Sequence, residues 1–224
     1  MSGQVLFIHG AGGGAWEFDS WQEEFERYGW RTLARNLSAN GDLSGVSFLD
    51  YLSQVEEWVK SLQEPPVIIG ASLGGLLALK AAESIPLRAL VLVNPIPPAG
   101  FVASPRLAWP DVVAWSQSPL ADTEKSMFDC TPESAARAHS QWRDESGRVL
   151  AEAHAGIDCR VPSAPTLVLI SQLDADVPPG DIAAMAASYG SDVHFCKGMS
   201  HLGPLLGPHA TEVCRVVIDW LGPV

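Results

Sequence analysis

The chain has 224 residues, of which 47% are hydrophobic, and a mean hydropathy of +0.11, which is enough for the core of one domain. It carries 14 Lys and Arg against 26 Asp and Glu, for a net charge of −12. This charge repels phosphate backbones and anionic lipid headgroups, so we expect no binding to nucleic acid or to a membrane. The oligomeric state stays open at this point.

The N-terminal segment "MSGQVLFIHG" has no basic region, and its apolar run extends only from Val5 to Ile8. This pattern predicts no typical signal peptide. The four cysteines show neither a C-x-x-C pair nor the spacing of a disulfide framework. We therefore expect free thiols in a reducing environment and a cytoplasmic protein.

Short β-rich runs alternate with helical segments along the chain. The expected strands are residues 5–8, 30–34, 67–70, 87–94, 166–171 and 192–197. The expected helices are residues 20–28, 48–62, 73–84, 181–189 and 210–221. Continuous apolar strands that alternate with helices predict an α/β protein with a parallel sheet covered on both faces.

Residues 97–160 break this alternation because they contain no strong strand. Within them, "CTPESAARAHSQW" predicts a helix with Thr131 as N-cap and Pro132 at the first helical position, and a second, weaker helix follows. An insertion at the carboxyl end of a sheet strand lies where ligands bind in open α/β sheets. We therefore interpret residues 97–160 as a small helical lid on a core formed by 1–96 and 161–224. A purely structural helical layer is the alternative.

The stretch "GASLGG" centres Ser72 between Gly70 and Gly74, with an expected strand before it and an expected helix after it. A G-x-S-x-G pattern alone is a weak signal, but this strand–turn–helix context is the one that a nucleophile elbow requires. Small residues on both sides allow a tight, strained turn, and the helix N-terminus favours negative charge there. Ser72 is therefore the candidate nucleophile.

A serine hydroxyl needs a base, and the base needs an orienting carboxylate. Among six histidines, His201 follows the last expected strand in the loop "GMSHLGP", from which it can face Ser72. After the strand "TLVLIS", the loop "QLDADVPP" offers Asp174, with Asp176 as a competitor. Asn94 follows an earlier strand but carries no charge, so we expect the acid in the Asp174 loop.

The segment "HGAGGGAW" (9–16) follows the first expected strand, and its glycines let backbone N–H groups approach a ligand closely. A phosphate-binding loop is the alternative. However, the pattern G-x-x-x-x-G-K is absent, and Arg35 and Asn36 stand where a ribose-binding acid would follow the second strand. We therefore reject nucleotide binding and expect the segment to hold an oxyanion.

Together, the blocks "VLFIHGAGGGAW", "VIIGASLGG", "LDADVPP" and "GMSHLGPLL" resemble those of the α/β-hydrolase superfamily over nearly the whole chain. The chain order Ser72, Asp174, His201 is that superfamily's order. The start "HGAxxGAW" is similar to the branch of small plant methyl esterases and hydroxynitrile lyases. Because the HG block begins at residue 9, the resemblance implies an α/β-hydrolase fold with about six strands instead of eight. Ala71 departs from the polar residue that often precedes the serine.

The resemblance and the residues together imply a serine esterase. Ser72 attacks a carbonyl, His201 takes its proton, and Asp174 holds the tautomer of the histidine. Backbone N–H groups of Ala11 and Leu73 form the oxyanion hole, and water then hydrolyses the acyl-enzyme. The expected substrate is a small, largely apolar carboxylic ester, and the mechanism requires no metal and no organic cofactor. The candidate pocket residues, which alternatively form lid core, are Trp109, Trp115, Phe128 and Trp142.

Three other functions fit the same pattern. A thioesterase would share the triad. A hydroxynitrile-lyase-type enzyme that cleaves a C–C bond would also need a cationic side chain, and no loop lysine is an evident source. From a different class, the chain would be a non-catalytic small-ligand-binding protein of the same fold, against which the complete set of Ser, His and Asp argues.

Overall fold

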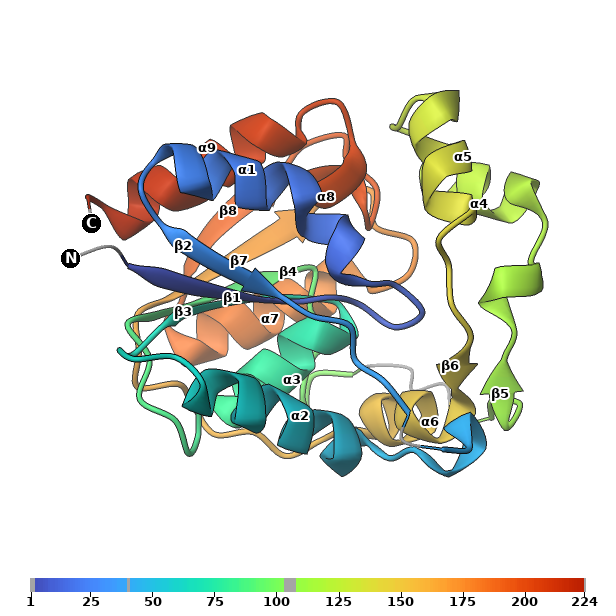
Figure 1. Cartoon of the computed structure of the whole chain (residues 1–224), viewed down its shortest axis with the longest axis horizontal. Coiled ribbons are helices and arrows are strands. Elements are labelled where there is room, and N and C mark those ends of the chain that lie inside the picture. Colours follow the sequence, from blue (N-terminus) through green and yellow to red (C-terminus); the bar gives the residue numbers. More distant parts are fainter. Residues whose placement is uncertain (1–2, 40, 103–107, 224) are drawn as a thin grey trace.

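The computed structural model describes residues 3–39, 41–102 and 108–223, and its centre is a six-stranded sheet (Figure 1). The strand order is β2-β1-β3-β4-β7-β8, and every neighbouring pair is parallel. The strands are β1 (Gln4–Ile8), β2 (Arg31–Ala34), β3 (Val67–Ala71), β4 (Ala89–Val93), β7 (Thr166–Ser171) and β8 (Asp192–Cys196). The predicted parallel sheet is thereby confirmed, with boundaries that differ by one or two residues.

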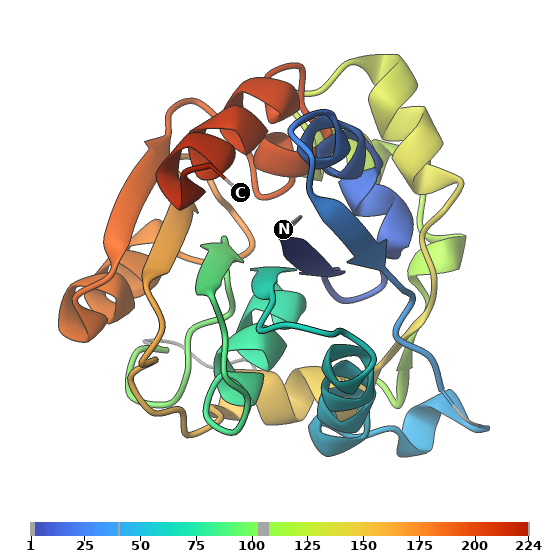
Figure 2. The same cartoon turned by 60° about the vertical axis from the view of Figure 1, so that its left-hand side comes forward.

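Helices cover both faces of this sheet (Figures 1 and 2). One face packs against α1 (Asp19–Arg27) and α9 (Ala210–Leu221). The other packs against α2 (Phe48–Lys60), α3 (Leu73–Ala81) and α7 (Pro179–Tyr189). Because successive side chains of a strand point to opposite faces, both sets of side chains in the central strands are buried. Apart from Gln4, Thr166 and Ser171 at strand ends, these strands are therefore apolar.

Residues 97–160, hereafter the insertion, lie between β4 and β7 in the chain. The helices and strands of their described part stand at the edge of the sheet toward which the strand arrows point (Figure 1). Thr131 accepts a hydrogen bond from the Ser134 N–H and Pro132 opens the helix, as predicted. Among the described residues of the insertion, one α-helix, one 3₁₀ turn and a two-residue antiparallel strand pair were not predicted, because segments this short leave no periodic pattern. The elements are β5 (Val112–Val113), η3 (Trp115–Gln117), α4 (Leu120–Ser126), α5 (Pro132–His139), β6 (Glu145–Ser146) and α6 (Gly147–Ala155).

Three short helical turns complete the chain: η1 (Ala15–Phe18), η2 (Leu43–Gly45) and α8 (Gly203–Leu206). All four cysteines are free, as expected, and Cys196 and Cys214 are buried. Within residues 3–39, 41–102 and 108–223, none of the helices combines the length and the apolar character that crossing a bilayer requires.

Candidate active site

Ser72 lies at the junction of β3 and α3 in a strained backbone conformation, with φ 52° and ψ −118°. A positive φ is uncommon for a residue other than glycine and costs about 1–3 kcal/mol, so the surrounding structure has to hold it. The N–H of Ser72 donates to the Val93 carbonyl at 3.0 Å, and its carbonyl accepts from the N–H of Ile96 at 3.1 Å. These bonds to the end of β4 fix the turn and leave the side chain of Ser72 partly exposed.

The glycines around Ser72 are required by close packing. A Cβ atom on Gly70 would overlap the carbonyl of Gly74, and one on Gly74 would overlap the carbonyl of Ile8 in β1. A Cβ atom on Gly10 would lie 3.3 Å from the Cβ of Ser72. Glycine at these positions therefore lets the elbow pack against β1 and brings the glycine-rich loop beside the serine.

The imidazole of His201 and the carboxylate of Asp174 form a buried pair. Nδ1 of His201 lies 2.7 Å from Oδ2 of Asp174. Oδ1 of Asp174 accepts hydrogen bonds from the N–H groups of Asp176 at 2.8 Å and Val177 at 2.9 Å. Because the carboxylate is an acceptor, Nδ1 carries the proton and Nε2 is left as the basic nitrogen.

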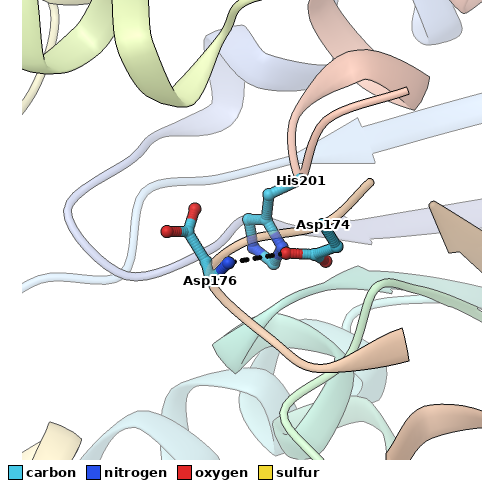
Figure 3. A group of neighbouring side chains, drawn as sticks. All are labelled: Asp174, Asp176 and His201. Carbon is cyan, nitrogen blue, oxygen red and sulfur yellow. Dashed lines mark hydrogen bonds and ion pairs between the residues drawn. The ribbon is translucent and has the colours of Figure 1, made fainter. Parts of the chain in front are cut away.

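Asp176, the competing acid, contributes its backbone to this arrangement. Its carboxylate is exposed and points away from that of Asp174 (Figure 3). Asp174, Asp176 and His201 also offer atoms within 4.8 Å of one another, as a metal site would. Since both oxygens of Asp174 already accept hydrogen bonds, the group fits the orienting acid of a histidine better than a set of metal ligands.

Electrostatics keep the imidazole of His201 ready to accept a proton. Burial of the ring opposes protonation, but the hydrogen bond and charge of Asp174 outweigh it, and the charges of Asp176 and Glu17 add to them. The pKa of His201 is therefore raised above its ordinary value. These charges therefore stabilise the cationic form of the imidazole.

Two side chains from other segments hold the loop that carries His201. Nδ2 of Asn94 donates to the His201 carbonyl at 2.7 Å and to Oγ of Ser171 at 2.8 Å. Oδ2 of Asp129, from the insertion, accepts the N–H of Ser200 at 3.0 Å. The sequence excluded Asn94 as the acid but did not reveal this link, for which the only local signal is an asparagine directly after a buried strand.

Buried carboxylates and an arginine immobilise the glycine-rich loop after β1. The N–H of Gly10 donates to Oε2 of Glu17 at 3.2 Å, and the N–H of Gly12 donates to Oε2 of Glu145 at 3.0 Å. The backbone N–H of Arg143 donates to the carbonyl of Gly12 at 2.7 Å. The insertion therefore contributes two of the residues that set the shape of this loop.

His9 supports the loop as a neutral side chain. Its Nε2 accepts the N–H of Leu37 at 2.9 Å and faces the guanidinium of Arg143 at 3.2 Å, so the ring proton is on Nδ1, which donates to the Gly10 carbonyl at 2.7 Å. Burial is the main reason that the pKa of His9 is lowered to about 4. His9 is thus a structural residue of the glycine-rich loop.

Two amides beside Ser72 remain without an acceptor. Within the part of the chain that the structure describes, the N–H groups of Ala11 and Leu73 donate to no other group. Leu73 opens α3, where the helix dipole favours a negative charge. A pair of unpartnered N–H groups at this place suits the binding of an oxyanion.

Ser72, His201 and Ala11 line one cavity of about 720 Å³, which the insertion partly walls. Three of the four aromatic residues expected there, Trp109, Trp115 and Trp142, line it as well. Phe128 does not, and the prediction for this residue is wrong: its side chain is 51% exposed, on the short stretch between α4 and α5. The lining is mixed and not purely apolar, since it also includes Glu17, Ser118, Asp122, Thr123, Asp176 and Asp181.

A strained serine at the carboxyl end of a parallel sheet, in a cavity that the histidine of a His–Asp pair also lines, is the arrangement of α/β proteins with a nucleophile elbow. The family model described as the alpha/beta hydrolase family matches residues 5–216. The chain belongs to this family.

Solved structures share the fold at low sequence identity. A tomato methylketone synthase I aligns with a TM-score of 0.79 and 15% identity over 99% of each chain. Polyneuridine aldehyde esterase aligns with a TM-score of 0.77 and 20% sequence identity, over 98% of this chain and 99% of its own chain. The monoacylglycerol lipase of Paleococcus ferrophilus aligns with a TM-score of 0.76 and 17% sequence identity, over 98% of this chain and 93% of its own chain. A comparison with curated proteins found no match.

Proposed function

We propose that this protein is a serine hydrolase that cleaves a small carboxylic ester through an acyl-enzyme. The observation that carries the proposal is that Ser72 and His201 line one cavity while His201 is hydrogen-bonded to the buried carboxylate of Asp174. The two unpartnered amides next to Ser72 support it, because acyl transfer develops negative charge on the substrate oxygen. The esterases and a lipase among the similar structures are consistent with it.

The proposed reaction has two steps. Oγ of Ser72 attacks the ester carbonyl while Nε2 of His201 takes the serine proton, and the N–H groups of Ala11 and Leu73 bind the resulting oxyanion. The intermediate collapses, and the alcohol leaves with the proton from His201. Water then attacks the acyl-enzyme with the same base, which releases the carboxylic acid and restores Ser72. Asp174 stabilises the imidazolium in both steps.

The walls of the cavity support a small ester with an apolar part. Trp109, Trp115 and Trp142 offer flat apolar surfaces beside Ser72. Among the described residues that line the cavity, none is lysine or arginine, which disfavours a lyase that would stabilise cyanide with a cationic side chain. We propose that residues 97–160 act as a lid on this cavity.

A fluorophosphonate probe tests the nucleophile. We expect one adduct per folded chain, on the peptide that contains "GASLGG", because an activated serine attacks the phosphorus atom. Mass spectrometry of the labelled digest measures the site, with heat-denatured protein as the control. Labelling of a different serine, or none on the folded protein, would contradict the proposal and favour a non-catalytic ligand-binding protein.

The lid proposal predicts a change in substrate preference. Replacing Trp109 or Trp115 by alanine should change kcat/KM for some acyl chain lengths and not others, by about tenfold, because one ring forms part of the wall. The measurement is a panel of p-nitrophenyl esters from acetate to octanoate, with each oxygen ester paired with its thioester. Phe128→Ala, outside the cavity, is the matched control. A uniform loss that parallels a lower Tm would assign both tryptophans to the lid core instead.

A further inference from the structure

Glu17 is a buried carboxylate that has no role in the proposed two-step reaction. It lies in η1, directly after the glycine-rich loop, and only 1% of its surface is exposed. It lines the same cavity as Ser72 and His201, and its Oε2 accepts the N–H of Gly10 at 3.2 Å. A buried carboxylate beside the reacting groups costs stability unless it is compensated, so its presence calls for a functional reason.

The position of Glu17 brings its charge close to the reacting groups. The point at which a Cβ of Gly10 would lie is 3.3 Å from Cβ of Ser72 and 3.9 Å from Oε2 of Glu17. The carboxylate therefore packs against the glycine-rich loop, which also carries the Ala11 N–H. On the other side, the Gly13 backbone packs directly against the Glu17 carboxyl group, where a Cβ atom would overlap it.

The charged groups around this carboxylate come from two other segments. His201, on the loop after β8, and Arg143, just before β6, both act on it electrostatically. The guanidinium of Arg143 is directed at the Gly13 and Leu37 carbonyls, at 2.7 and 2.9 Å. His201 in turn faces Asp174 and Asp176 from the loop after β7. Proton uptake by His201 is therefore the event in the proposed reaction that creates a positive charge facing Glu17.

On the basis of the proposed function, the geometry points to Glu17 as a positioning residue. Its carboxylate holds the glycine-rich loop through Gly10 and, when ionised, stabilises the positive charge that His201 acquires as it deprotonates Ser72. Asp174 stabilises the imidazolium through a hydrogen bond to Nδ1, whereas the charge of Glu17 stabilises it through space from the end of the glycine-rich loop. The two carboxylates thus act on one imidazole from separate segments of the chain.

Glu17 ionises near neutral pH, where activity and NMR titrations can measure this role. Burial raises its pKa from 4.5 to about 7, against the opposing effects of the Gly10 N–H, His201 and Arg143. Because the pKa in the folded protein lies above that of the unfolded chain, the native state binds the extra proton between these values. The contribution of the neutral carboxyl to stability is complete below pH 4.5 and is lost as pH rises through about 7.

The variant Glu17→Gln tests the charge, since glutamine keeps an oxygen for the Gly10 N–H. We expect the pKa of His201, measured by NMR titration of its imidazole, to fall by about half a pH unit or more. The acid limb of kcat/KM for p-nitrophenyl butyrate should move to lower pH. The value of kcat should fall about tenfold with little change in KM, because the lost interaction forms only during proton transfer.

Glu145→Gln is the matched control. Glu145 is also buried and also accepts an N–H of the glycine-rich loop, from Gly12, but it is not among the charges with the largest effects on His201. This variant should leave the pKa of His201 unchanged even if it loosens the glycine-rich loop. An equal shift of the His201 pKa in both variants would show a loop effect and overturn the inference.

Thermal unfolding supplies a second readout of the buried charge. As pH rises from 5 to 8, the Tm of Glu17→Gln should rise relative to that of the wild type. The reason is that the wild type has to ionise the buried carboxyl group of Glu17 over this range, whereas the glutamine stays neutral. An unchanged His201 titration in Glu17→Gln overturns this inference alone. Failure of the fluorophosphonate to label Ser72 overturns the proposed function instead, and the NMR titration still decides whether Glu17 acts on His201.

Discussion

Replacing Ser72 by alanine is expected to lower kcat for ester hydrolysis by at least about 10⁴-fold, because the variant has no atom that forms the acyl-enzyme. The fold should tolerate the change. The main chain of residue 72 holds the elbow through hydrogen bonds to Val93 and Ile96, and these do not depend on the side chain. Alanine has to adopt the same positive φ as serine, so the backbone strain should be similar. Steady-state rates on p-nitrophenyl esters measure the effect, and an unchanged Tm shows that the protein is intact.

Ser200→Ala is the control for the Ser72 variant. Ser200 is a buried serine next to His201, and its Oγ has no hydrogen-bond partner among the residues that the structure describes. Its removal should leave kcat within a few-fold of the wild type. Activity of Ser72→Ala within about tenfold of the wild type would contradict the assignment of the nucleophile.

Asp174→Asn is expected to lower kcat by about a thousandfold to ten-thousandfold. Oδ1 of Asp174 accepts two backbone N–H groups, from Asp176 and Val177, so the oxygen of an asparagine has to stay there. The NH₂ group then faces Nδ1 of His201, which must become an acceptor and place its proton on Nε2. This is the wrong tautomer for a base that takes the proton of Ser72.

The pH dependence checks the same prediction. Loss of the Asp174 charge and hydrogen bond should lower the pKa of His201, so the acid limb of any residual activity should move to lower pH. Asp176→Asn is the control, and its effect on kcat should be much smaller because that carboxylate is exposed and solvent screens its charge. The reverse order of the two effects would assign the acid to Asp176 and leave the hydrolase proposal in place.

The fold and part of the site follow from local patterns in the sequence. Four strands are buried at every position because both faces of the sheet are covered, so their residues are apolar except at some strand ends. This composition is visible in "VLFI" or "TLVLIS" without any knowledge of their partners. The elbow at Ser72 is equally local, since its strand, glycines and helix are contiguous. The loops with His201 and Asp174 were placed because the carboxyl ends of parallel strands meet at one edge of a sheet.

Only the tertiary structure decided the features that depend on segments far apart in the chain. Asp174 and Asp176 have the same local pattern, and the one that bonds to His201 is set by how the loop after β7 turns back on itself. Trp115 and Phe128 both belong to the insertion, yet only the first lines the cavity, because the packing of short helices is not periodic in sequence. The link from Asn94 to the His201 loop and the burial of Glu17 beneath the glycine-rich loop arise in the same way. Such contacts are made by side chains that carry no local signal, and their energies come from burial and from charges brought together only when the sheet has formed.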